Sequence, residues 1–215
     1  MFRYLAVKAA VLAVAAAIVA ASASSPAEAT LAIQMQSGAA TYNQTGPSPL
    51  VVVHPIGNFT TTVNTGTATS APALDLSSVD ISSSAGGTLV ITLSADGYTA
   101  PVGSAGWLTQ FSGNFISGAA TVTLQTYLNN SNTLLATSTL LSTLTATTTP
   151  FALSDLVDAT TVSPYALTEV LTITTTGAAH VSLDASLTDA PEPASLAILG
   201  SALAGLGTLA RRRKR

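Results

Sequence analysis

The stretch GTLVITLSA at residues 87–95 decides the fold class. Leu89, Ile91 and Leu93 alternate with valine, threonine and serine, so the three larger side chains share one face of an extended strand. Residues 30–190 contain 32 Thr and 19 Ser, and β-branched threonine favours strands over helices. Outside the two ends of the chain no long pattern repeats with the helical period of 3.6 residues. This composition and alternation predict an all-β domain.

Alternation bounded by turn residues predicts further strands. These are residues 30–36, 50–54, 58–63, 73–82, 119–128, 133–140, 166–175 and 178–187. The turn at 129–132 predicts a hairpin between its two neighbouring strands, and Thr176-Gly177 predicts a second hairpin between 166–175 and 178–187. Nine or ten short strands predict an antiparallel β-sandwich of jelly-roll type over residues 30–190.

The charged residues are segregated along the chain. All seven basic residues lie in the first eight or last five positions, and all ten acidic residues lie between Ala9 and Ala210. A nucleic-acid-binding domain needs a basic surface, so we expect no nucleic-acid partner. The absence of cysteine excludes a disulfide framework, a catalytic thiol and a thiolate zinc site.

Residues 1–29 have the organisation of a secretory signal peptide. Arg3 and Lys8 precede an uninterrupted apolar run over residues 9–21, and a polar stretch then ends in Ala27-Glu28-Ala29. Small residues spaced in this way form a signal peptidase site, so cleavage after Ala29 would leave Thr30 as the new N-terminus. Cleavage after Ala23 and an uncleaved anchor helix are the alternatives.

The C-terminal end has three successive parts. Pro191-Glu192-Pro193 precedes a 17-residue uncharged apolar run at 194–210, which as a helix is about 25 Å long and can just cross a bilayer. The chain ends in a basic cluster: Arg211, Arg212, Arg213, Lys214 and Arg215. Such a cluster remains on the cytoplasmic side, so residues 30–190 are expected on the far side of the inner membrane.

This arrangement resembles the PEP-CTERM sorting signal of Gram-negative bacteria over residues 191–215. The resemblance implies that the membrane protease exosortase recognises Pro191-Glu192-Pro193 and removes the helix. The inner membrane would then hold the precursor only transiently, and the mature protein would reach the cell surface or the extracellular matrix. The resemblance also implies an association with exopolysaccharide, biofilm or floc. A permanent C-terminal anchor is the alternative.

Catalytic groups are sparse. Only two histidines occur, no Gly-x-Ser-x-Gly elbow is present, and no histidine or thiolate spacing suggests zinc. The alternation places Asp75 and Asp80 on opposite faces of a strand, and Asp155 and Asp158 are expected in a loop after Pro150. We interpret these acids as solvated surface residues, although a glycosidase can draw its two carboxylates from distant strands. We therefore expect no enzyme activity, no cofactor and no metal. The histidines are His54 and His180.

Two features leave alternatives open. Glu169 shares a strand face with Leu167, Leu171 and Ile173, so it is either an inward-pointing charge on an edge strand or a calcium ligand. The aromatic row spaced by four residues either packs in the core, which is the favoured interpretation, or forms an exposed platform on which sugar rings stack. The row consists of Trp107, Phe111 and Phe115.

The sequence thus predicts an exported, non-catalytic surface or matrix protein with a structural or adhesive role. One alternative is a carbohydrate-binding module that uses the Trp107 face. The other is a secreted polysaccharide hydrolase. Signal peptidase and exosortase are the expected partners during maturation, and exopolysaccharide is the expected partner afterwards.

Overall fold

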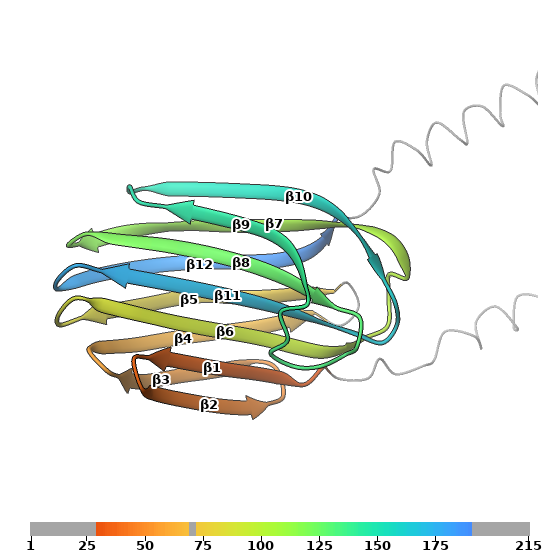
Figure 1. The fold of residues 1–215 in the computed structure, drawn as a ribbon, viewed down its shortest axis with the longest axis horizontal. Coiled ribbons are helices and arrows are strands. Elements are labelled where there is room, and N and C mark those ends of the chain that lie inside the picture. The colour runs from red at the N-terminus through yellow and green to blue at the C-terminus, as the bar shows by residue number, and fades with distance from the viewer. Residues whose placement is uncertain (1–28, 69–71, 191–215) are drawn as a thin grey trace, which may run out of the picture.

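The computed structural model describes residues 29–68 and 72–190, which form twelve β-strands and no helix (Figure 1). The strands are β1 (Leu31–Ser37), β2 (Ala40–Gly46), β3 (Leu50–Ile56), β4 (Phe59–Ala68), β5 (Ala73–Ser83), β6 (Gly87–Tyr98), β7 (Gly103–Ser117), β8 (Ala120–Asn129), β9 (Thr139–Ala146), β10 (Phe151–Thr161), β11 (Tyr165–Thr175) and β12 (Ala179–Ala190). They pack as two antiparallel sheets face to face. The all-β prediction is therefore confirmed for this part of the chain.

The strand order is that of a jelly roll. The first sheet has the order β2-β1-β6-β11-β8-β9, and the second sheet has the order β10-β7-β12-β5-β4-β3. From β5 to β12 every connection except that between β8 and β9 carries the chain from one sheet to the other. These eight strands form the jelly roll, while the hairpins β1-β2 and β3-β4 widen the two sheets along the same side. The predicted jelly-roll sandwich is confirmed.

Alternating side chains from both sheets fill the core. Leu89, Ile91 and Leu93 of β6 are fully buried, as their shared face predicts. The largest buried side chains come from both layers and include Trp107, Tyr165, Phe59 and Phe111. Since no disulfide is available, burial of this apolar surface is the main source of stability.

The hairpin predicted at Thr176-Gly177 is wrong. β11 lies in the first sheet between β6 and β8, whereas β12 lies in the second sheet between β7 and β5. Both strands have one apolar face, and a turn signal marks a reversal of the chain without stating whether the two strands pair or face each other across a sandwich. The other predicted hairpin does form between β8 and β9, but its return strand begins at Thr139.

Two other expectations need correction, and one strand was not predicted. Asp155 and Asp158 lie within the edge strand β10, which pairs with β7 from Phe151 to Thr161, and so do not belong to a loop. The strand β2, rich in polar residues, was not predicted because it carries no apolar alternation. The strand predicted at 50–54 continues through Pro55 to Ile56, because β3 is an edge strand that tolerates a residue without an N–H donor.

The predicted signal peptide up to residue 28 and the predicted sorting segment at 191–215 lie outside the described residues. Within the described ranges, no helix has the length and hydrophobicity that a membrane span requires.

Candidate functional site

A β-bulge shapes the outer face of the second sheet. At Ser78 the backbone of β5 has a φ of 54°, and the register of β5 with β12 shifts at this point. The Ser78 N–H donates a hydrogen bond of 2.9 Å to Oδ1 of Asp184 on β12, so the unpaired donor of the bulge is satisfied. The extra residue shifts the alternation by one position, so that even-numbered side chains point inward before the bulge and odd-numbered ones after it. Asp75 and Asp80 therefore both lie on the outer face, which corrects the prediction of opposite faces.

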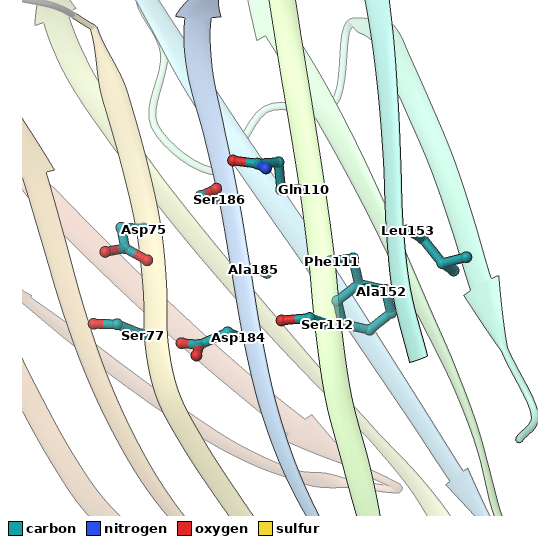
Figure 2. A pocket seen from close by; sticks show the side chains of 10 residues that line it. All are labelled: Asp75, Ser77, Gln110, Phe111, Ser112, Ala152, Leu153, Asp184, Ala185 and Ser186. Atoms are coloured by element: carbon teal, nitrogen blue, oxygen red, sulfur yellow. The ribbon is translucent and has the colours of Figure 1, made fainter. Parts of the chain in front are cut away.

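A polar groove crosses this outer face. Two adjoining hollows, of about 460 and 350 Å³, share Ser112 and Asp184 in their walls. Figure 2 shows the larger one, where Asp75 of β5, Asp184 of β12 and Gln110 of β7 lie around the same space. We call the two hollows together the second-sheet groove. Its side chains are mainly carboxylates, hydroxyls and amides: Asp75, Ser77, Asp80, Gln110, Ser112, Asn114, Ser182, Asp184 and Ser186.

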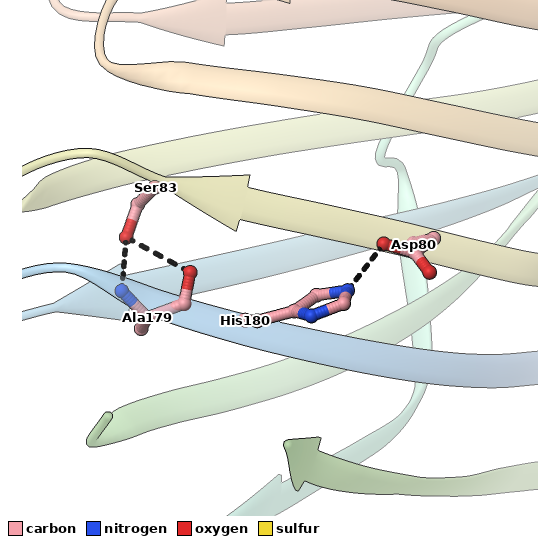
Figure 3. Close-up of polar contacts among 4 residues, drawn as sticks. All are labelled: Asp80, Ser83, Ala179 and His180. Carbon is pink, nitrogen blue, oxygen red and sulfur yellow. Dashed lines mark hydrogen bonds and ion pairs between the residues drawn. The ribbon is translucent and has the colours of Figure 1, made fainter. Parts of the chain in front are cut away.

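The groove is acidic. Partial burial raises the pKa of Asp75, and the nearby negative charge of Asp184 raises it further. No lysine or arginine occurs between residues 9 and 210 to balance these carboxylates. At one end Nε2 of His180 lies 2.7 Å from Oδ1 of Asp80, and the pair is partly exposed (Figure 3). Such a surface is suited to neutral hydrogen-bonding ligands or cations and repels anions.

The aromatic row does not form an exposed platform. Trp107 and Phe111 have exposed fractions of 0% and 1%, and both point into the core from β7. The ring of Trp107 packs edge-on against Tyr165 with a centroid distance of 5.9 Å, and Phe111 packs against Phe151 at 4.9 Å. The core interpretation is confirmed for these two residues. Trp107 and Phe111 are therefore out of reach of a sugar, so the three residues do not form one exposed stacking platform. Phe115 is partly exposed and packs against Phe151 at a centroid distance of 5.8 Å.

The two histidines lie apart. His54 is on the edge strand β3 and stacks on Tyr42 at a centroid distance of 4.0 Å, whereas His180 is on β12. Two strands, β4 and β5, separate them in the second sheet. Across residues 29–68 and 72–190, no group of three or more histidine, aspartate or glutamate side chains could hold a metal ion.

Glu169 lies in the core. It is 0% exposed on β11, which is a central strand of the first sheet, so the interpretation as an edge-strand charge is wrong. Neither of its carboxyl oxygens has a hydrogen-bond partner among the described residues. Loss of hydration raises the pKa of Glu169 well above its usual value, and the charge of Asp75 adds to this shift. A buried carboxyl of this kind is held in its neutral, protonated form.

Sequence reasoning missed the groove because the groove depends on the bulge. The signal was present: alternation in residues 73–82 breaks at Ser77-Ser78, which is where the extra residue lies. Correcting for one inserted residue would have placed Asp75 and Asp80 on the same face.

At the end of β12, residues 189–214 match the PEP-CTERM protein-sorting motif. The chain carries a PEP-CTERM sorting signal. This signal implies export towards the cell surface, exosortase as the processing partner, and a precursor anchored at its C-terminal end. The match begins at Asp189, which pairs with Trp107 in the second sheet, so the signal starts directly at the folded domain.

Comparison with curated proteins finds no match. Two solved structures are similar in part. One is TmCBM61 in complex with β-1,4-galactotriose, with 9% identity, a TM-score of 0.36, and alignment over 53% of this chain and 70% of that one. The other is the enzymatically active domain of bacteriophage CBA120 tailspike protein 4, with 9% identity, a TM-score of 0.36, and alignment over 62% of this chain and 20% of that one. At these scores neither likeness bears on function.

Proposed function

We propose that this chain is an exported, exosortase-processed, non-catalytic component of the cell surface or extracellular matrix, with a structural or adhesive role in the exopolysaccharide layer. The PEP-CTERM motif at 189–214 carries this proposal. An acidic sandwich without lysine or arginine, joined directly to the sorting signal, suits a module that is exposed outside the cell and is repelled by other anionic surfaces.

Both proposed processing positions are adjacent to one end of the sandwich. β1 begins and β12 ends at the same end, so the chain enters and leaves the domain there (Figure 1). Removal of both terminal segments would leave the other end and both outer sheet faces free. The second-sheet groove lies on one of these outer faces and not at the end where the chain enters and leaves the domain.

Replacing Glu192 with alanine is expected to trap the precursor in the membrane. An epitope tag placed after the signal cleavage site would be followed in the native host by immunoblotting of membrane and surface fractions. The wild-type chain should shorten by about 2 kDa, the mass of about twenty residues from the apolar run and basic tail, whereas Glu192→Ala should keep its full length. Asp158→Ala, which removes an exposed acid from β10, is the matched control and should be processed normally. Wild-type surface protein that still carries Arg215 would contradict removal of the anchor.

A second candidate function is binding of neutral polysaccharide in the second-sheet groove. Its supporting observation is the groove itself, where hydroxyl, amide and carboxylate groups from β5, β7 and β12 line one open trough. Sugar hydroxyls both donate and accept hydrogen bonds, so they match these groups better than an anion would. In this version of the carbohydrate-binding alternative, the polysaccharide binds in the second-sheet groove and not on the buried face of Trp107.

Gln110→Ala is expected to weaken binding of the exported protein to the host's exopolysaccharide about two- to tenfold, which corresponds to the loss of one hydrogen bond of about 0.5–1.5 kcal/mol. Gln110 is exposed in the groove, and Gln125→Ala on the outer face of the first sheet is the matched control. Co-sedimentation with purified polysaccharide measures both. Equal affinities of Gln110→Ala and Gln125→Ala for the polysaccharide would exclude the groove as its binding site. Release of reducing sugar, abolished by an Asp→Asn change in the groove, would instead favour the hydrolase.

A further inference from the structure

The first residue of the proposed mature chain is already in contact with an acid. The backbone nitrogen of Thr30 lies 3.2 Å from Oδ1 of Asp96, to which it donates a hydrogen bond. In return, the N–H of Asp96 donates to the carbonyl oxygen of Thr30 at 3.3 Å. The two bonds stand directly before the ladder of β1 and β6, whose first pair is Leu31 with Ala95. Asp96 therefore clamps the start of β1.

We propose that cleavage after Ala29 converts this clamp into an ion pair between the new α-ammonium group of Thr30 and the carboxylate of Asp96. The inference rests on the proposed function, in which signal peptidase matures the chain. Hydrolysis of the Ala29–Thr30 bond consumes one water molecule. It leaves a carboxylate on Ala29 of the released peptide and an amine on Thr30, which takes up the proton. The nitrogen that donated one hydrogen bond as a neutral amide then carries a positive charge and three donors.

The surroundings favour this pairing. Residues 30–190 contain no lysine or arginine, so the protonated α-amino group has no competitor for Asp96 other than the imidazolium forms of His54 and His180. Thr30 is exposed, so the charge keeps most of its hydration while it contacts Asp96. The hollow beside Thr30 is lined by uncharged residues: Ala29, Thr45, Gly46 and Pro47. Tyr98 lies near Asp96, and its hydroxyl donates to the carbonyl oxygen of Ala73 and stays neutral in this pH range.

Maturation and folding are coupled in this arrangement. In the uncleaved chain, Ala29 is 5% exposed, and the N–H of its peptide bond to Thr30 is hydrogen-bonded to Asp96. A protease could therefore reach that bond only before β1 pairs with β6. After cleavage the new terminus binds Asp96, which holds the start of β1 in the sheet and keeps it from fraying. A terminus formed at another position cannot place its charge on Asp96 in this way.

The absence of lysine makes a direct test possible. The mature protein would be recovered from the surface of the native host, and its N-terminus identified by mass spectrometry. Reductive methylation with ¹³C-formaldehyde then labels the α-amine alone, since residues 30–193 contain no lysine. Its titration is followed by NMR. Asp96→Asn is expected to lower the titration midpoint of the labelled α-amine by about 0.2–0.7 pH unit, because the variant removes the carboxylate that stabilises the charged form. Asp158→Asn on β10 removes the same charge at a distant edge and should leave the titration unchanged.

The possible outcomes separate the two proposals. A chain that begins at Thr30 but has the same α-amine titration with and without Asp96 would overturn the ion pair while leaving export intact. A mature N-terminus at another residue would overturn it as well. A second methylated signal from Lys214 would show that the sorting segment is retained, which contradicts exosortase processing but leaves the Thr30 measurement valid.

Discussion

Trp107→Ala is expected to lower the free energy of unfolding of the domain by about 3–5 kcal/mol. Trp107 is the largest fully buried side chain and contacts Tyr165 edge-on, so truncation removes both its burial and an aromatic pair. The neighbouring strands β12 and β10 pair with β7 at this position, which limits how far the backbone can collapse into the cavity. Urea unfolding monitored by far-ultraviolet circular dichroism measures the change.

The same substitution separates the core interpretation from the sugar-stacking one. Leu156 on β10 has an exposed fraction of 62%, so Leu156→Ala is a control that should change stability by less than about 0.5 kcal/mol. If Trp107→Ala lost affinity for polysaccharide while keeping wild-type stability, Trp107 would be a ligand contact and its burial in the sandwich would be refuted. Loss of stability with unchanged affinity in the folded fraction supports the core role.

Strands with a clear apolar alternation were predictable because each needs only its own sequence, whereas β2 and β10 were not predicted. Leu89, Ile91 and Leu93 occupy the buried face of β6 that their spacing predicts, and the jelly-roll class followed from the number of such strands. Which strands pair with each other was harder to predict from the sequence. Thr176-Gly177 reverses the chain, but the sequence does not state whether β12 joins β11 in one sheet or faces it from the other. That choice depends on which edges β6, β7 and β8 leave open, which is a property of the whole fold.

The second-sheet groove could not be predicted because it depends on a bulge in β5 and on a contact with the distant strand β12. The bulge at Ser78 turns Asp80 to the same side as Asp75, and Asp184, which is 106 residues away in sequence, satisfies its N–H. The spacing correctly places Glu169 on one face with Leu167, Leu171 and Ile173. The edge-strand alternative is wrong because β6 and β8, both remote in sequence, flank β11 on its two sides. The sorting signal could be identified from the sequence alone, because the order of Pro-Glu-Pro, apolar run and basic cluster along the chain is sufficient.

The stability of the domain is expected to fall as the pH rises above about 4.3, the ordinary pKa of an unfolded glutamate. Burial raises the pKa of Glu169 in the folded state, and no described group donates a hydrogen bond to its oxygens. Between the unfolded and folded pKa values the native state therefore holds one proton more than the unfolded state. The free energy of unfolding then decreases by about 1.4 kcal/mol per pH unit until Glu169 ionises in the folded protein. Urea titrations at a series of pH values would give this slope.

Glu169→Gln is expected to remove most of that slope, because the amide is neutral at every pH. Near pH 4, where the wild-type carboxyl is protonated, the two proteins should be similarly stable, and the variant should become the more stable one as the pH rises. Asp75 and Asp189 also have raised pKa values, so the slope that remains in Glu169→Gln measures their share. Asp158→Asn controls for the loss of one acid from an exposed strand. An unchanged slope in Glu169→Gln would mean that Glu169 finds a partner or water in solution and ionises without cost, which contradicts the unpaired, buried carboxyl in the first sheet.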